Sequence, residues 1–291
     1  MNASSVVNPL ISASELLGAL EGGSPLVLVD ARFWLGQHGR GRAAYEAGHI
    51  PGARFVDVDE ELAEPARGDG IRPGTSARGR HPRPSAERLT GAVGRLGIND
   101  DSSVVVYDQG TSLAAAWLRW LLRDAGQLNI RVLDGGFAAW QAAGGAVSTD
   151  DPADGTGSFV PQPGQLPALT VDEVPGFLAA GHQLVDVRAA ERFRGETEPV
   201  DPIAGHIPGA SNLPASTLQQ ADGRFLPAAD LRVHLSGIAA GDAFSCGSGL
   251  TASQALLAAE SAGIYGLAIY PGSWSEWIAD PTRPVAVGGG V

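Results

Sequence analysis

The chain has 291 residues and a formal net charge of −12, and 44% of its residues are apolar, a composition typical of a soluble globular protein. All 20 basic residues are arginine, which excludes enzymes that need a catalytic or phosphate-binding lysine. The acidic balance argues against nucleic acid and anionic membranes as partners, because both attract cationic surfaces.

Cysteine usage and the N-terminal sequence indicate the compartment. Cys246 is the only cysteine, so no intrachain disulfide can form. Residues 1–23 lack the charged start and apolar core of a secretory signal, and no apolar run reaches the roughly 18 residues of a membrane span. These features predict a cytoplasmic protein. The six histidines show no metal-ligand spacing, so we expect no metal. We also expect no cofactor.

The two halves of the sequence repeat each other, which is typical of duplicated domains. Three landmarks recur in the same order: Val29–Arg32 as Val185–Arg188, Ala47–Ala53 as Ala204–Ala210, and Val132–Trp140 as Ile269–Trp277. The first copy is longer between its second and third landmarks. The extra residues fall around Ala66–Arg83, which is rich in Gly, Pro and Arg without periodicity and is predicted to be a loop.

Strand and helix patterns alternate along both copies. The apolar runs Leu26–Val29, Val104–Tyr107 and Leu184–Val187 predict buried strands, and Ser112–Leu122 predicts a helix. This alternation favours an α/β fold in which each domain is a mainly parallel sheet flanked by helices. We place the domains at residues 1–154 and 155–291, joined by a polar, turn-forming linker.

The copies differ where a central strand ends. The first copy has Asp108 at this point and the second has Cys246, followed by Gly247-Ser248-Gly249 and a helical pattern over Thr251–Ala262. In open α/β sheets, ligands bind at the carboxyl ends of the strands. Loop amides and a helix N-terminus there form an anion-binding nest, which would stabilise a thiolate. The sequence therefore predicts a reactive thiol rather than a buried structural cysteine.

Other readings of the same loop fit less well. A cysteine phosphatase needs an arginine six positions after the cysteine, but Ala252 stands there. The spacing Gly247-x-Gly249-x-x-Ala252 resembles a dinucleotide fingerprint, but no acidic residue follows near Leu267 and Ala268. Neither alternative is favoured.

These motifs resemble the two-domain sulfurtransferases of the rhodanese superfamily, in particular the 3-mercaptopyruvate sulfurtransferases. The resemblance covers nearly the whole chain, and its most specific part is the loop Cys246-Gly247-Ser248-Gly249-Leu250-Thr251. Family members that use mercaptopyruvate carry Cys-Gly-Ser-Gly-Val-Thr, so this chain differs by Leu250. Thiosulfate sulfurtransferases carry a basic pair after the cysteine. The neutral Gly247 and Ser248 therefore favour a monoanionic α-keto acid thiol as donor.

The resemblance implies two rhodanese-like domains, the first lacking the cysteine and the second catalytic. It also implies that Cys246 takes the sulfur of 3-mercaptopyruvate, releases pyruvate and holds a persulfide. The acceptor would be cyanide, a small thiol or a thioredoxin-type protein. Two alternatives stay open: a thiosulfate sulfurtransferase, and a persulfide carrier that loads only in the presence of a protein partner.

The family also implies roles for residues outside the loop. A relay of serine, histidine and aspartate is matched by Ser248, His81 and Asp59, and it would move a proton during catalysis. Asp59 could equally be a turn former.

Arginines are the candidates for binding the donor carboxylate. The family arginine in Arg-Phe is matched by Arg192, whose guanidinium would pair with the carboxylate. The second family arginine is missing, because Val200 follows Glu198-Pro199, and Arg194 is the candidate to compensate. The remaining predicted substrate contacts are Gly247, Gly249, Leu250 and Thr251. Because Arg32 and His49 recur as Arg188 and His206 in both copies, we expect these four to be structural.

Overall fold

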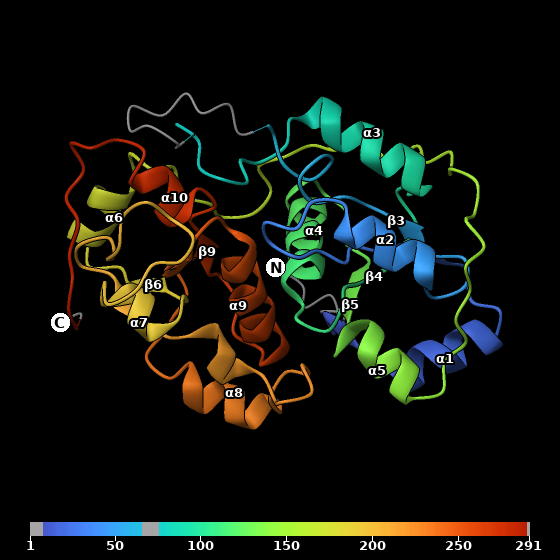
Figure 1. Ribbon diagram of the computed structural model, residues 1–291. Coiled ribbons are helices and arrows are strands. Elements are labelled where there is room, and N and C mark those ends of the chain that lie inside the picture. The colour runs from blue at the N-terminus through green and yellow to red at the C-terminus, as the bar shows by residue number, and fades with distance from the viewer. Residues whose placement is uncertain (1–7, 66–75, 290–291) are drawn as a thin grey trace. The chain divides into compact units, whose positions relative to one another are not determined.

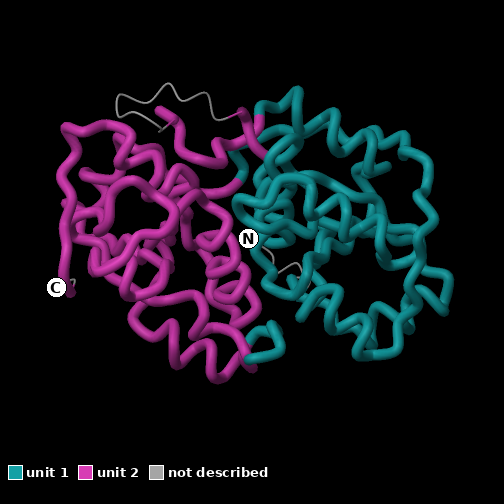
Figure 2. Tube along the Cα trace, in the orientation of Figure 1, with its two compact units in different colours: residues 1–62, 85–165, 221–225 teal, residues 63–84, 166–220, 226–291 magenta. Residues whose placement is uncertain are grey.

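The computed structural model describes residues 8–65 and 76–289 (Figure 1). The chain forms two compact units that are interleaved in sequence (Figure 2). Unit 1 comprises residues 1–62, 85–165 and 221–225, and unit 2 comprises residues 63–84, 166–220 and 226–291. No single cut in the chain separates these units, and the ranges 1–154 and 155–291 stay a prediction. Of the predicted loop Ala66–Arg83, residues 66–75 lie outside the described residues, and the rest contains no helix or strand.

Within the described residues of unit 1, five parallel strands form one sheet in the order β1-β5-β4-β2-β3. The strands are β1 (Leu10–Ile11), β2 (Leu26–Asp30), β3 (Arg54–Phe55), β4 (Ser103–Tyr107) and β5 (Ile130–Leu133). The helices are α1 (Ala13–Glu21), α2 (Arg40–Ala47), α3 (Ala86–Leu96), α4 (Leu113–Asp124) and α5 (Gly136–Ala142). The apolar runs predicted as strands are thus strands at the centre of the sheet, as expected for strands covered on both faces.

Unit 2 repeats this plan with four parallel strands among its described residues, in the order β7-β6-β8-β9. The strands are β6 (Leu184–Asp186), β7 (Ser211–Asn212), β8 (Ala243–Ser245) and β9 (Ala268–Ile269). The helices are α6 (Val174–Ala179), α7 (Ala190–Phe193), the 3₁₀ turn η1 (Ala215–Leu218), α8 (Ala228–His234), α9 (Leu250–Ser261) and α10 (Ser273–Trp277). The prediction of an α/β fold with two mainly parallel sheets flanked by helices is therefore confirmed.

Each sheet is covered by one largely buried helix that follows its central strand. In unit 1, α4 packs against β4 and β5, and in unit 2, α9 packs against β8 and β9. Both helices are rich in alanine and leucine, and most of their residues are buried. This packing fixes the start of α9 beside the end of β8, and therefore fixes the loop that carries the cysteine.

The repeated Asp-x-Arg motif has the same structural role in both units. Arg32 Nη2 donates to the carbonyl oxygen of Gly48 at 2.7 Å, and Arg188 Nη2 donates to that of Gly205 at 2.7 Å. Each arginine also pairs with the aspartate two residues before it, at 2.8 Å and 2.6 Å. The motif thus ties the end of a central strand to the Gly-His-Ile-Pro-Gly turn.

The repeated histidines are buried inside their own units. His49 Nδ1 is 2.8 Å from the carbonyl oxygen of Tyr45, and its ring stacks on the Tyr45 ring at 3.9 Å. His206 Nδ1 is 2.7 Å from the carbonyl oxygen of Phe193, and its ring stacks on the Phe193 ring at 3.7 Å. These equivalent contacts give both histidines a packing role in the turn.

No helix among the described residues is long and apolar enough to cross a membrane.

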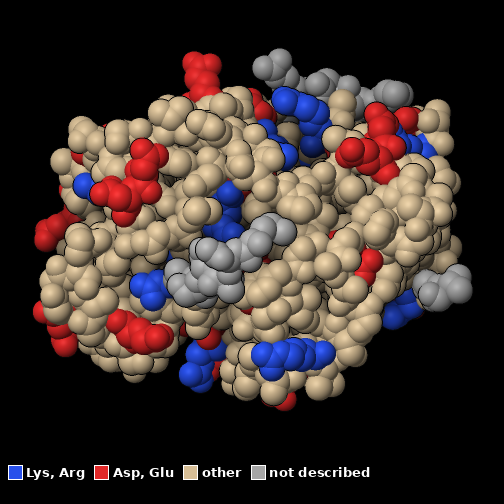
Figure 3. Space-filling view, turned by 180° about the vertical axis from the view of Figure 1, so that it is seen from behind, with Lys and Arg blue, Asp and Glu red and all other residues tan. Residues whose placement is uncertain are grey.

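On the face shown in Figure 3, basic and acidic side chains are scattered among neutral residues. The view therefore shows no broad basic surface on that face of the kind that attracts a phosphate backbone.

Candidate functional site

Cys246 is the first residue after β8 and stands at the carboxyl end of a central strand, where the sequence analysis places it. Its side chain is buried, with 2% of the residue exposed. The backbone N–H of Gly249 donates to Sγ at 3.1 Å, and α9 begins at the next residue, Leu250. The sulfur thus accepts a hydrogen bond from the backbone N–H of the N-cap residue of α9.

The equivalent loop in unit 1 surrounds the side chain of Asp108 with backbone N–H groups. Asp108 follows β4 as Cys246 follows β8, and its buried carboxylate accepts hydrogen bonds from successive amides. Oδ1 accepts from the N–H groups of Gly110 and Ser112, both at 2.9 Å, and Oδ2 accepts from Ala114 at 3.2 Å. Burial raises the pKa of Asp108, and the backbone hydrogen bonds act in the opposite direction. The unit 1 loop therefore directs several backbone N–H groups at one acidic side chain, and Cys246 stands at the matching place in unit 2.

Ser273 is a residue of the site that the sequence analysis missed. Its Oγ accepts the backbone N–H of Cys246 at 3.0 Å and donates to the carbonyl oxygen of Tyr270 at 2.7 Å. Ser273 has a φ of 54°, and Gly136 at the matching position of unit 1 has a φ of 57°. A non-glycine residue rarely adopts this conformation without a compensating contact. The signal was present in the third landmark, where a serine replaces a glycine.

The structure brings together two members of the predicted relay. Ser248 Oγ and His81 Nδ1 are joined by a hydrogen bond of 2.7 Å, and both residues are buried. Asp59 belongs to unit 1 and lies 3.0 Å from Nδ1 of His38 through Oδ2. Its neighbour Asp57 is a turn former, because Asp57 Oδ1 accepts the N–H of Asp59 at 2.9 Å. A role for Asp59 in the relay stays a prediction.

His81 reaches the loop because a segment of the first sequence copy belongs to unit 2. Residues 63–65 and 76–84 belong to unit 2, and the N–H of Arg80 donates to Ser275 Oγ at 3.0 Å. The N–H of Ser275 in turn donates to the carbonyl oxygen of Gly247 at 3.0 Å. This chain of contacts places Arg80 and His81 beside the residues that follow Cys246.

Arg192 lies beside the loop, with Nη2 3.9 Å from a Cβ built on Gly247, and it belongs to a network of ion pairs. It pairs with Glu198 at 2.6 Å and with Asp201 at 3.2 Å. Burial would raise the pKa of Glu198, but the hydrogen bonds from Arg192 and from the Asp201 backbone lower it. Arg194 instead forms an exposed pair with Glu196 at 2.7 Å. Substrate contacts stay predictions for all six residues proposed to make them: Arg192, Arg194, Gly247, Gly249, Leu250 and Thr251.

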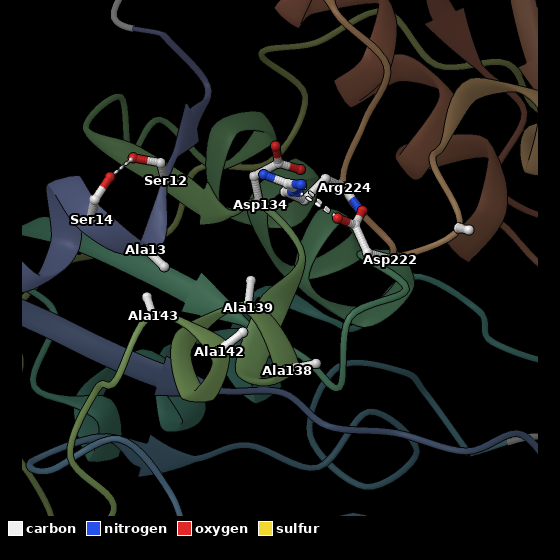
Figure 4. Close-up of a pocket in the computed structure, with 11 residues that line it drawn as sticks. Ser12, Ala13, Ser14, Asp134, Ala138, Ala139, Ala142, Ala143, Asp222 and Arg224 are labelled. Carbon is white, nitrogen blue, oxygen red and sulfur yellow. Dashed lines mark hydrogen bonds and ion pairs between the residues drawn. The ribbon is translucent and has the colours of Figure 1, made fainter.

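Unit 1 contains a cavity of about 770 Å³ (Figure 4). Alanines of α5 form much of its wall, and Asp134 and the exposed Asp222–Arg224 ion pair lie at its edge. Asp134 Oδ1 accepts the N–H of Phe225 at 2.9 Å, and burial raises the pKa of this carboxyl. The cavity contains none of the predicted site residues. No group of three or more His, Cys, Asp or Glu side chains in residues 8–65 and 76–289 is arranged as metal ligands.

Comparison with known proteins identifies the family of both sequence copies. Residues 12–143 and 170–280 both match the model of the rhodanese-like domain. The chain is 41% identical to a putative thiosulfate sulfurtransferase, SseB, of Mycobacterium tuberculosis, over 96% of this chain and 97% of the relative. It is also 41% identical to a probable 3-mercaptopyruvate sulfurtransferase of Pseudomonas aeruginosa, over 96% of this chain and 98% of the relative.

Among solved structures, the chain is similar to the anaerobic ergothioneine biosynthesis enzyme from Chlorobium limicola. The TM-score is 0.82 at 26% identity, and the match covers 99% of this chain and 72% of that enzyme. The same family is indicated by both sequence copies and by the relatives, and the fold is similar to that of a solved structure. The chain belongs to the rhodanese-like family and carries two domains of that family, the second with the cysteine.

Proposed function

We propose that this protein is a sulfurtransferase that moves sulfane sulfur from 3-mercaptopyruvate to an acceptor through a persulfide on Cys246. The observation that carries the proposal is the buried thiol at the end of β8, with the Gly249 N–H on its sulfur and the Ser248–His81 pair in the same loop. Membership of the rhodanese-like family and a 41% identical relative named for this activity support it.

The chemistry is a two-step transfer through a covalent intermediate. The Cys246 thiolate attacks the sulfur of 3-mercaptopyruvate, an S–S bond forms, and the C–S bond breaks with its electron pair left on carbon. The resulting enolate takes a proton and leaves as pyruvate. An acceptor thiolate or cyanide then attacks the outer sulfur, and the S–S electron pair returns to Cys246 as a thiolate. We assign the delivery of that proton to Ser248 and His81, and their hydrogen bond of 2.7 Å supports this role.

A Ser248→Ala variant is expected to lower kcat with 3-mercaptopyruvate by about a hundredfold, the scale of one general acid–base contribution. With thiosulfate as donor, the loss is expected to be much smaller, because sulfite leaves without needing a proton. Steady-state rates with the two donors measure this difference, and the rate of the same variant with thiosulfate is the control for its rate with 3-mercaptopyruvate. Equal rates for Ser248→Ala and the wild type with 3-mercaptopyruvate would remove the relay from the mechanism.

A thiosulfate sulfurtransferase is the second candidate, favoured by the name of the relative from Mycobacterium tuberculosis. The intact mass of the protein after mixing with each donor, with pyruvate measured in parallel, separates the two. We expect 3-mercaptopyruvate to add one sulfur atom and release pyruvate at the higher kcat/KM. Faster turnover of thiosulfate would favour the second candidate, and loading only in the presence of a partner protein would favour a persulfide carrier.

The proposed acceptors are cyanide, a small thiol, or a thioredoxin-type protein in the cytoplasm. The single cysteine is free, so the protein has no second thiol of its own to resolve the persulfide. An outside nucleophile must therefore collect the sulfur.

A further inference from the structure

A guanidinium lies where a side chain after Cys246 would begin. The next residue, Gly247, has no Cβ, and a Cβ built there would lie 2.9 Å from Arg80 Nη2. The same point is 3.9 Å from Arg192 Nη2 and 3.9 Å from Asp201 Oδ2. The loop sequence carries no charged side chain at positions 247 and 248, but charged side chains lie beside it, and one of them, Arg80, comes from a distant part of the chain.

The two arginines differ in how many of their donors are already engaged. Arg192 donates to Glu198 through Nε and Nη2 and also contacts Asp201. Among the described residues, the Arg80 guanidinium bonds only to Asp201, through Nη1 at 2.6 Å. Its Nε is buried and has no hydrogen-bond partner among them. Because a guanidinium has five N–H donors, Arg80 has the larger unused capacity to bind an anion.

Asp201 controls the charge of this pair. Its carboxylate bridges the arginines, with Oδ1 on Arg80 and Oδ2 on Arg192, and its side chain is 3% exposed. Together with Glu198, it balances the two guanidinium charges, so these four side chains sum to zero. A balanced cluster can accept one negative charge from a ligand more readily than two.

We propose that Arg80 is a specificity-determining residue that binds the carboxylate of the α-keto acid donor, and that Asp201 limits the site to monoanions. Arg80 thereby supplies the second guanidinium that is absent at Val200. The proposal rests on the sulfurtransferase function proposed above and adds to it the residue that recognises the donor. A side chain at position 247 would require the Arg80 guanidinium to move, because a Cβ there would lie 2.9 Å from its Nη2.

The test compares Arg80→Met, Arg80→Lys and Asp201→Asn with the wild type. Arg80→Met is expected to raise KM for 3-mercaptopyruvate at least about tenfold with little change in kcat, because a charged hydrogen bond is lost from ground and transition states alike. The KM of Arg80→Lys is expected to lie between those of the wild type and Arg80→Met, since lysine keeps the charge without the planar guanidinium. Asp201→Asn is expected to shift kcat/KM about tenfold towards thiosulfate, a dianion.

Arg78→Met is the matched control, because Arg78 is exposed and lies in the same segment. We expect it to keep wild-type constants. A fall in kcat for Arg80→Met without a change in KM would overturn the proposal, since Arg80 would then only position His81. Constants equal to those of Arg78→Met would overturn it too.

A binding measurement separates this proposal from the proposed function. In a Cys246→Ser background, which cannot form a persulfide, calorimetry gives the Kd of pyruvate, a carboxylate that stays intact. Arg80→Met is expected to weaken pyruvate binding about tenfold relative to Arg78→Met. If the wild type fails to transfer sulfur but this difference is found, the proposed function fails and the anion site stands. Equal affinities would overturn the anion site whatever the enzyme does.

Discussion

A Cys246→Ser variant is expected to lose sulfur transfer from either donor by at least about a thousandfold, as enzymes do when the nucleophile is removed. The hydroxyl can accept the N–H of Gly249 as the sulfur does at 3.1 Å, so we expect the loop to keep its conformation. Oxygen at this position cannot form the S–S bond that stores the transferred atom. Pyruvate release and thiocyanate formation measure turnover, and intact mass measures sulfur loading.

Ser261→Ala is the control for this variant. Ser261 lies at the far end of α9, and its Oγ donates to the carbonyl oxygen of Ala258 at 2.8 Å within the same helix. It changes one hydroxyl on the helix that follows the loop without touching the cysteine, and we expect a wild-type rate. If Cys246→Ser kept a rate close to that of Ser261→Ala, the sulfur would be transferred without a covalent stage on this residue.

The sequence alone predicts the fold well because it contains the fold twice. The strand and helix patterns around Val104–Tyr107 are ambiguous in isolation, but the same order of landmarks in both halves excludes most alternatives. The position of Cys246 follows from the same comparison, because a loop and a buried helix directly after a central strand fix one place in a parallel sheet.

The surroundings of the loop could not be predicted in the same way. Arg80 and His81 are part of the first sequence copy but pack in the second unit, and no local pattern reports a contact between segments so far apart in the chain. Gly247 and Ser248 are both neutral and predict a neutral site, whereas the structure places the Arg80 guanidinium beside Gly247. The charge of a binding site depends on all the segments that meet there, not only on the motif that carries the nucleophile.

An Arg32→Met variant is expected to lower the free energy of unfolding by about 3–5 kcal/mol, the cost of leaving one member of a buried ion pair unpaired. Arg32 is 6% exposed and Asp30 is fully buried. Arg32 Nε lies 3.1 Å and 3.0 Å from the two Asp30 oxygens. The substitution also removes the donor at 2.7 Å from the Gly48 carbonyl oxygen, so it loosens the turn as well as leaving a buried carboxylate. Urea unfolding followed by tryptophan fluorescence measures the change.

A double-mutant cycle identifies the cause of that loss. If the unpaired carboxylate dominates, the double variant Asp30→Asn/Arg32→Met should be more stable than Arg32→Met alone, because the second substitution removes the buried charge. The exposed Arg40 side chain donates to Gln37 Oε1 and stacks over Trp34, so Arg40→Met should change stability by about 0.5 kcal/mol or less. A loss for Arg32→Met no larger than this control would mean that the Asp-x-Arg motif does not anchor the turn. The recurrence of the motif in a unit that has lost its cysteine would then need a cause other than stability.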